Sequence, residues 1–234
     1  RSEAGLGWRT MQLGAQGFEQ LDARGIEGHA AAARLRERFG VDTMEFYAGT
    51  AHRAILADPS GDEPGALGGV LPGSARVALV RCDFKERTHV TDDQGHLVRA
   101  SDDEPALLAV HISDDEDMWD GPSLVRDAFG DGSSWLLTSD VIKRDARGKH
   151  WFVDSLSGFV SLRNGGVVST RAIEDVVYTL PDVAVAAAWE MGRGSGEVGV
   201  VYSRESKLED AGDQDDERVL DALMTRLPPN ERPA

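Results

Sequence analysis

The stretch from Ser134 to Asp154, SWLLTSDVIKRDARGKHWFVD, constrains the fold of this chain more than any other segment. An apolar run leads into a Thr-Ser-Asp triplet, and a charged turn then leads to a second, aromatic run that ends on Asp154. Two such runs joined by a short polar turn predict an antiparallel β-hairpin. The triplet places the Asp140 carboxylate at a strand end, where a rigid edge can hold a ligand's paired hydroxyl groups. Most strand-end Asp residues only accept backbone hydrogen bonds in a turn, so both roles stay open.

The composition narrows the classes of protein to consider. With 234 residues the chain can bury the core of one large domain or of two modest ones, and its 41% hydrophobic content is ordinary for a globular protein. The net charge of -16 argues against nucleic acid as a partner. The single Cys82 excludes an internal disulfide framework. No apolar run reaches the length of a membrane span and no signal peptide is present, so we expect a cytoplasmic protein.

The hairpin segment resembles a motif of the adenylate-forming acyl-CoA synthetases, and more narrowly of their very-long-chain acyl-CoA synthetase or fatty-acid-transport branch. That family has a Trp, a Thr-Gly-Asp triplet, basic residues, an Asp-x-x-Gly turn and a Phe-x-Asp-Arg end. Ser139 stands in place of the family's Gly, and Ser155 in place of its Arg. The positions that this chain shares with the motif are Trp135, Thr138, Asp140, Arg144, Asp145, Gly148, Phe152 and Asp154.

Other segments follow in the order that the family has. Upstream, Glu45 to Thr50 (EFYAGT) resembles the family's phosphate-contacting Glu-Phe-Tyr-Gly-x-Thr-Glu segment. Downstream, residues 165–189 (GGVVSTRAIEDVVYTLPDVAVAAAW) resemble the start of the family's small C-terminal lid. The resemblance covers nearly the whole chain and is weakest before Arg34 and after Met191. Several segments in the correct order make the assignment much stronger than one motif would.

The resemblance implies a mixed α/β (α+β) fold made of two parts. Residues 1–153 would form the strand-rich, C-terminal portion of the large AMP-binding domain, and residues 154–234 the small α/β lid, truncated before the family's catalytic Lys. The family's phosphate-gripping loop has no counterpart in residues 1–40. We therefore expect either a piece of a longer enzyme, completed by missing flanking sequence, or a shortened relative.

Periodicity and turn residues agree with a strand-rich chain. Ser169 and Thr170 are good helix caps before a segment in which apolar residues share one helical face. We expect strands over 10–13, 43–47, 107–112, 183–189 and 197–203, a loop over 58–73, a hairpin between 159–162 and 167–168, and helices over 28–39, 123–129, 170–180 and 219–227.

The resemblance assigns roles to individual residues, and each has a plainer alternative. Asp140 would accept from the ribose hydroxyls and Thr50 would contact phosphate. Tyr47 fits a wall against the adenine and plain packing equally well. Gly14 fits the purine-contacting turn, and Gly165 the thiol-substrate tunnel, but a turn explains either glycine equally well.

Two departures bear on the cofactors that the resemblance implies, namely ATP or AMP, coenzyme A and magnesium. Ala51 stands where the family has the Glu that holds magnesium, and a methyl group cannot ligate a hard cation. Ser155 replaces the Arg that would clamp the nucleotide, which removes a fixed charge. We interpret His52 as a loop histidine, and we expect no metal site and no catalytic residue in this chain.

Two hypotheses about function remain. In the first, the chain is part of a long-chain or very-long-chain fatty acyl-CoA synthetase, which joins a fatty acid to the thiol of coenzyme A or of a carrier protein. Such an enzyme uses ATP to convert the carboxylate into an acyl-adenylate, and we expect this chain to be inactive alone. In the second, it is a degenerate, non-catalytic relative that binds nucleotide or acyl groups or serves as a scaffold. Ala51 and Ser155 favour the second hypothesis, and the extent of the match favours the first.

Overall fold

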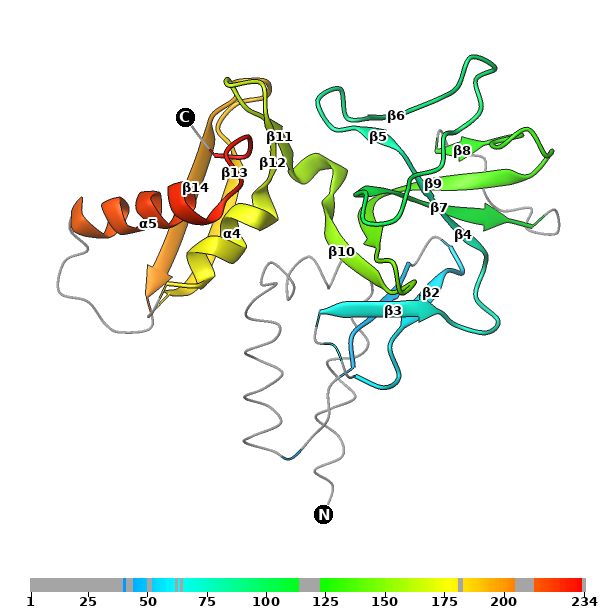
Figure 1. The fold of residues 1–234 in the computed structure, drawn as a ribbon, viewed down its shortest axis with the longest axis horizontal. Helices are drawn as coiled ribbons and strands as arrows, with labels where there is room; N and C mark the ends of the chain where they lie inside the picture. Colours follow the sequence, from blue (N-terminus) through cyan, green and yellow to red (C-terminus); the bar gives the residue numbers. More distant parts are fainter. Residues whose placement is uncertain are drawn as a thin grey trace.

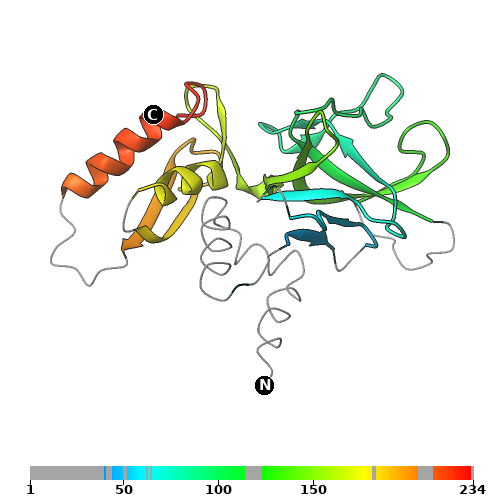
Figure 2. The same cartoon turned by 60° about the horizontal axis from the view of Figure 1, so that its bottom comes forward.

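The computed structural model describes residues 40, 44–49, 52–61, 63, 65–113, 123–180, 183–204 and 213–232. Figures 1 and 2 show two groups of elements, a strand-rich group that runs from β1 to β10 and a helix-containing group that includes α4, α5, β13 and β14. The strand expected over 10–13 and the helix expected over 28–39 lie outside the described residues, as do Gly14, Thr50 and Ala51.

The strand-rich group is built on one antiparallel sheet with the order β1-β2-β3-β10-β9-β7-β4, and β8 also pairs with β9. A separate two-stranded ribbon consists of β5 and β6. The bounds of these strands are β1 Phe46–Ala48, β2 Ile55–Ala57, β3 Ala66–Val70, β4 Val77–Val80, β5 Cys82–Asp83, β6 Thr88–His89, β7 Ala106–Ile112, β8 Leu124–Val125, β9 Ser134–Arg144 and β10 His150–Ser155.

The hairpin predicted from the sequence is confirmed as β9 and β10, which lie in the interior of the sheet. Lys143 pairs with Trp151 beside the turn, and Asp140 pairs with Ser155 at the far end. The helix expected over 123–129 is wrong, because this segment forms the short strand β8 followed by a turn. A strand there pairs with Trp135 and Leu136 of β9, and that pairing outweighs the local helical pattern.

The loop expected over 58–73 is also wrong, because β3 lies inside it. Gly68 has a φ of +73°, and a Cβ on it would lie 2.1 Å from the carbonyl oxygen of Ala57. Only glycine permits this close approach of β3 to the chain that follows β2. The glycines that suggested a loop are therefore what allows the strand to pack here.

The helix-containing group begins directly after β10. Ser169 caps α4 as predicted, since its side chain accepts a hydrogen bond from the Ala172 amide at 3.2 Å. Helix α4 packs against β13 and α5. The bounds are η1 Leu156–Gly158, β11 Phe159–Ser161, β12 Val167–Ser169, α4 Thr170–Tyr178, β13 Val183–Glu190, β14 Val198–Arg204 and α5 Asp213–Arg226.

The buried apolar side chains form separate clusters. One cluster joins α4, α5 and the strands β11 to β14, with Ile173 and Val177 fully buried at its centre. Two others lie on the main sheet, one around Leu108 and Ile142 and one around Trp135 and Val141. The second of these also includes Phe159 of β11. None of the described helices is long and apolar enough to span a membrane.

Candidate functional site

The Thr-Ser-Asp triplet forms a bulge within β9. Leu107 of β7 pairs with Val141 and Ala109 pairs with Leu137, so residues 138–140 lie opposite Leu108 alone. Asp140 therefore lies inside the strand and not just past its end, as the sequence had suggested. Its amide donates to Thr138 Oγ1 at 3.1 Å, and that hydroxyl donates to the Leu108 carbonyl at 2.9 Å. The bulge redirects the Asp140 side chain and fixes its backbone.

The partner strand β10 is irregular at the same level. Ile142 pairs with Phe152 and Val141 with Asp154, so one residue of β10 is left over between these pairs. Asp140 thus lies where the pairing of β9 is irregular with both of its neighbouring strands. Bulges at matching positions are a structural device for aiming a side chain away from the regular sheet faces.

Tyr47 of β1 contacts Asp140, and His52 contacts Tyr47. The Tyr47 hydroxyl donates to Asp140 Oδ2 at 2.5 Å, and His52 Nε2 lies 3.1 Å from the same hydroxyl. The two rings stack, with their centroids 5.7 Å apart. A Cβ on Gly49 would lie 2.1 Å from His52 Nε2, so a side chain at this position would displace the His52 ring.

The surroundings shift the protonation equilibria of these side chains. Burial, followed by the nearby Asp140 charge, raises the pKa of Tyr47 well above its ordinary value, so its hydroxyl keeps its proton. Burial raises the pKa of Asp140. The hydrogen bond from Tyr47 partly offsets this effect, as does the charge of His52 when that ring is protonated. Burial lowers the pKa of His52 against the opposing influence of Asp140. At neutral pH the network therefore holds a neutral phenol and a neutral imidazole beside a half-buried carboxyl group.

The position opposite Asp140 carries no charge. Ser155 is its cross-strand partner, and the Ser155 hydroxyl forms a 2.8 Å hydrogen bond with that of Ser157. This is the position where the resembled family has an Arg. A guanidinium here would lie beside Asp140, because directly paired residues share one face of a sheet.

Asp154, the other motif carboxylate at this end of the hairpin, is buried and holds the start of α4. Its Oδ1 accepts from the Ser155 amide at 2.7 Å. Its Oδ2 accepts from the Ser169 hydroxyl at 2.6 Å, from the Arg171 amide at 3.2 Å and from the Thr170 hydroxyl at 3.4 Å. A carboxylate at a helix N-terminus satisfies free amides and complements the helix dipole, so Asp154 has a structural role.

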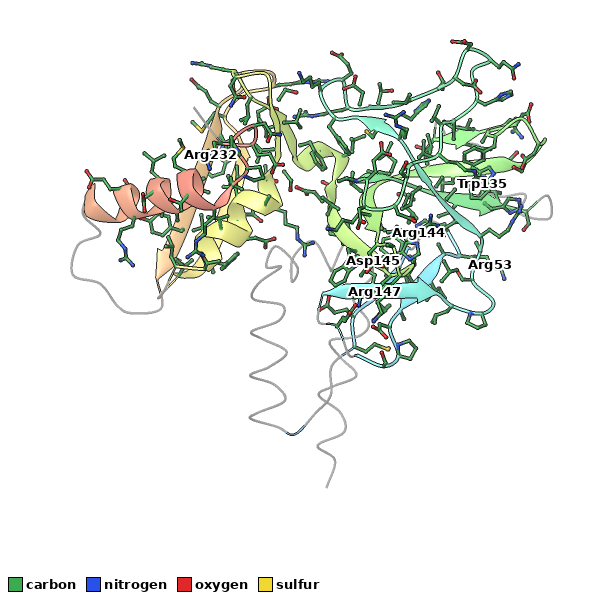
Figure 3. All side chains as sticks on the ribbon, in the orientation of Figure 1. Arg53, Trp135, Arg144, Asp145, Arg147 and Arg232 are labelled. Carbon is green, nitrogen blue, oxygen red and sulfur yellow. The ribbon has the colours of Figure 1, made fainter. Side chains whose placement is uncertain are left out.

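The opposite end of the hairpin is closed by a charged cluster beside β3 (Figure 3). Asp145 accepts from the amides of Arg147 and Lys149 at 3.0 and 2.9 Å. Arg147 pairs with Glu63, and Lys149 pairs with Asp58 at 2.8 Å. The motif's Asp-x-x-Gly turn is therefore stabilised by its own carboxylate and tied to the loop before β3.

Of the candidate residues proposed from sequence, the structure brings Tyr47 and Asp140 into contact. Gly165 lies in the β11–β12 turn with a φ of +84°, and its amide donates to the Leu162 carbonyl at 2.9 Å, as a turn glycine would. Gly14 and Thr50 lie outside the described residues. His52 was interpreted as a plain loop residue. The available signal in the sequence was Gly49, which lies between Tyr47 and His52 and leaves room for the His52 ring beside Tyr47.

The described residues contain no group of three or more His, Cys, Asp or Glu side chains that could hold a metal ion. What they offer is a half-buried carboxylate with an oriented phenol beside it. Such a pair can accept hydrogen bonds from hydroxyl groups and line a flat apolar ring, but it presents no cation to a phosphate.

Comparison with known proteins gives relatives of one kind, although no family model matches the chain. It is 26% identical over 117 residues to the very long-chain fatty acid transport protein of Cochliobolus heterostrophus, which covers 45% of this chain and 18% of that protein. It is 30% identical over 142 residues to the medium/long-chain-fatty-acid–CoA ligase FadD6 of Mycobacterium tuberculosis, which covers 57% of this chain and 23% of that protein.

Solved structures show the same fold. The anthranilate CoA ligase AuaEII, crystallised with anthranoyl-AMP, superimposes with a TM-score of 0.60 at 17% identity. The match covers 87% of this chain and 36% of that ligase. The chain thus spans less than a quarter of the length of the curated relatives and about a third of the structural one.

Proposed function

We propose that this chain is a C-terminal portion of an adenylate-forming acyl-CoA synthetase, of the long-chain or very-long-chain fatty acid type. The two curated relatives support this proposal, since their names refer to very-long-chain and to medium- and long-chain fatty acids. The substrates would be a fatty acid, ATP and a thiol, that of coenzyme A or of a carrier protein.

The chemistry explains why such an enzyme needs a nucleotide. A carboxylate is a poor electrophile, and ATP makes it reactive by supplying AMP as a leaving group that the thiol then displaces. The residues of this chain would bind and orient the adenosine part. Asp140 would accept hydrogen bonds from both ribose hydroxyls, and Tyr47 would lie beside the adenine.

The observation that carries the proposal is the contact between Tyr47 and Asp140 at paired bulges. Residues 93 positions apart meet through a 2.5 Å hydrogen bond, and they belong to the two segments that resemble the family's nucleotide-binding motifs. A regular antiparallel sheet needs neither bulge, so the irregularity has a purpose beyond pairing the strands.

The residues do not fit a magnesium-bound triphosphate. Ala51 offers no ligand, and Ser155 places a neutral hydroxyl opposite Asp140. The protein's own charge of -16 also repels a triphosphate. These positions favour a second candidate function, that of a degenerate, non-catalytic relative that retains weak adenosine or AMP binding. In either case we propose that the chain does not catalyse acyl adenylation on its own.

We further propose that residues from about 154 onward form the lid as a separate domain. The separate hydrophobic cluster around Ile173 supports this division. The contacts between the lid and the β5–β6 ribbon include stacking of Phe84 on Phe159 at 4.3 Å and hydrogen bonds from Arg87 to the Phe159 carbonyl and to Glu190.

Calorimetric titration tests the proposal. The wild-type chain should bind AMP weakly and more tightly than ATP-magnesium, and Asp140→Ala should abolish AMP binding. Asp93→Ala, which removes an exposed turn carboxylate, is the matched control and should bind AMP like the wild type. Equal AMP binding by the wild type and Asp140→Ala would reject the nucleotide site.

Pyrophosphate exchange tests whether the chain is inactive alone. Either one predicts no exchange by the 234-residue chain in the presence of a fatty acid and ATP-magnesium. Losing one group that stabilises developing charge commonly costs ~100-fold or more in rate, and here the metal carboxylate and the Arg are both replaced. Measurable exchange that depends on a fatty acid would contradict this expectation and exclude the degenerate relative.

A further inference from the structure

His52 has a defined hydrogen-bonding direction. The Ala54 amide lies 3.2 Å from His52 Nδ1, and a backbone N–H can only donate, so Nδ1 must accept and carries no proton. In a neutral imidazole the proton then lies on Nε2. Nε2 is 3.1 Å from the Tyr47 hydroxyl, so His52 donates to the Tyr47 oxygen.

That direction determines the next hydrogen bond. A phenol has one proton to donate, and once its oxygen accepts from His52 the proton is directed to Asp140 Oδ2, at 2.5 Å. A single chain of donors thus runs from the Ala54 amide through His52 and Tyr47 to the Asp140 carboxylate. Hydrogen bonds in such a chain polarise one another, which strengthens the last one.

The Asp140 carboxylate has need of this chain. Burial disfavours its ionised form, and its cross-strand partner Ser155 contributes no charge. In the described residues, Tyr47 is the titratable group that hydrogen-bonds to both His52 and Asp140. His52 and Asp140 also influence each other electrostatically. A donated phenol hydrogen bond is therefore the main means of keeping this carboxylate ionised.

We propose that His52 is a positioning residue that, through the Tyr47 hydroxyl, holds the Asp140 carboxylate ionised and aimed to accept from a ligand's paired hydroxyl groups. This inference rests on the proposed nucleotide site and adds to it a residue that the sequence motif does not contain. Gly49 belongs to the same device, because a side chain there would displace the His52 ring.

A consequence for pH follows from the same geometry. Protonation of His52 would place an Nδ1–H against the Ala54 amide, two donors facing each other, so the ring would turn away and its hydrogen bond to Tyr47 would be lost. AMP affinity should therefore fall as the pH drops through the His52 pKa, which burial lowers from its ordinary value. The side chain of Gln can donate from nearly the place of Nε2 but does not titrate, so His52→Gln should retain AMP binding and lose this part of the pH dependence.

Two measurements on the 234-residue chain test the proposal. The first is NMR titration of the ring nitrogens of His52 and of the Asp140 carboxyl carbon in the wild type, Tyr47→Phe, His52→Ala and His52→Gln. We expect an unprotonated Nδ1, and an Asp140 pKa that rises by about one unit in Tyr47→Phe, which is the size of one hydrogen bond. A smaller rise is expected in His52→Ala and almost none in His52→Gln.

The second is calorimetric titration with AMP from pH 5 to 8. His52→Ala should weaken AMP binding about three- to tenfold at pH 7.5, and His52→Gln should stay within about twofold of the wild type. The 2′,3′-dideoxy analogue of AMP should bind all variants equally poorly, because it lacks the hydroxyl pair.

The outcomes separate this inference from the proposed function. If Asp140→Ala loses AMP binding while His52→Ala retains it with an unchanged Asp140 pKa, the role of His52 is wrong and the nucleotide site stands. If Asp140→Ala binds AMP like the wild type, the proposed nucleotide site is wrong. The titration of the Asp140 carboxyl group then tests by itself whether His52 acts on Asp140 through Tyr47. Should His52→Ala fail to fold, a His52→Gln variant with the wild-type pH dependence overturns the inference.

Discussion

Asp140 and Asp154 lie on the paired strands β9 and β10, yet their surroundings differ in kind. Asp154 is buried and accepts from two backbone amides and two hydroxyl groups, which belong to Ser155 and to the start of α4. Asp140 is half-buried, and its side-chain partner is the phenol of Tyr47, in turn oriented by His52. Fixed local donors mark a structural carboxylate, whereas a partner from a distant loop leaves room for a ligand.

The difference shows that a shared motif does not assign a shared role. Both residues match the family's pattern, and both lie where the β9–β10 register shifts. What separates them is the source of their hydrogen-bond donors. Asp154 holds the helix-containing group to the sheet. Asp140 instead lies beside the bulges of β9 and β10, where its carboxylate can accept hydrogen bonds from a ligand.

Replacing Asp154 should have the largest effect on stability. Asp154→Ala removes several hydrogen bonds at the N-terminus of α4 and should lower the free energy of unfolding by roughly 2–4 kcal/mol. Urea denaturation measures this loss, with Asp93→Ala as the exposed control. A cost for Asp154→Ala no larger than that of the control would mean that this carboxylate does not hold the helix.

Replacing Asp140 should mainly affect binding. Asp140→Asn keeps the shape but removes the charge, and a lost charge-assisted hydrogen bond of about 1.5–3 kcal/mol corresponds to a ten- to hundredfold weaker affinity for AMP. Titration of AMP and a parallel urea denaturation measure the two properties. A variant that loses stability as Asp154→Ala does, yet binds AMP normally, would erase the contrast between the two residues.

Glu174 extends the comparison to a buried carboxylate whose donor is one backbone amide, that of Ala188 at 2.8 Å. Burial raises the pKa of Glu174 to about 7. Since the folded state then binds this proton more tightly than the unfolded state does, the contribution to stability present at low pH is lost as the pH rises from about 4.5 through 7.

Glu174→Gln keeps an acceptor for the Ala188 amide and abolishes the titration. It should be more stable than the wild type by roughly 1–2 kcal/mol at pH 8 and show little difference at pH 5. Urea denaturation at both pH values checks this, with the exposed Glu217→Gln as the control. An identical pH profile for the wild type and Glu174→Gln would show that Glu174 does not titrate near neutrality.

The smallest effect is expected where a carboxylate is matched by a cation. Arg87 bonds to Glu190 at 2.9 Å and to the Phe159 carbonyl, and both partners of the ion pair are largely shielded from solvent. Arg87→Met should lower the free energy of unfolding by about 1 kcal/mol. Arg163→Met breaks an exposed pair with Glu197 and should cost less than about 0.5 kcal/mol. Equal costs would mean that the contact of Arg87 with Glu190 and Phe159 adds nothing to stability.

The sequence predicted the elements whose signals are local. The β9–β10 hairpin followed from alternation around a charged turn, and the Ser169 cap of α4 followed from residue type. The sequence did not predict features that depend on contact with a second, distant segment. Gly68 lies in a strand because β3 approaches Ala57 closely, and no local pattern shows that approach.

The candidate site was predictable in part for the same reason. Tyr47 and Asp140 were found through motif resemblance, and their contact agrees with it. The bulges depend on the pairing of β9 with β7 and β10, and the role of His52 depends on its ring lying against Gly49. These features arise from tertiary contacts, which a single sequence does not display.

The most direct test of the contrast between the two carboxylates uses the unmodified protein. The carboxyl carbons of all Asp residues are followed by NMR while AMP is added to the wild-type chain at pH 7.5. The account predicts that the Asp140 resonance shifts in a saturable way while that of Asp154 stays in place. A saturable shift at Asp154 with an unmoved Asp140 would contradict it.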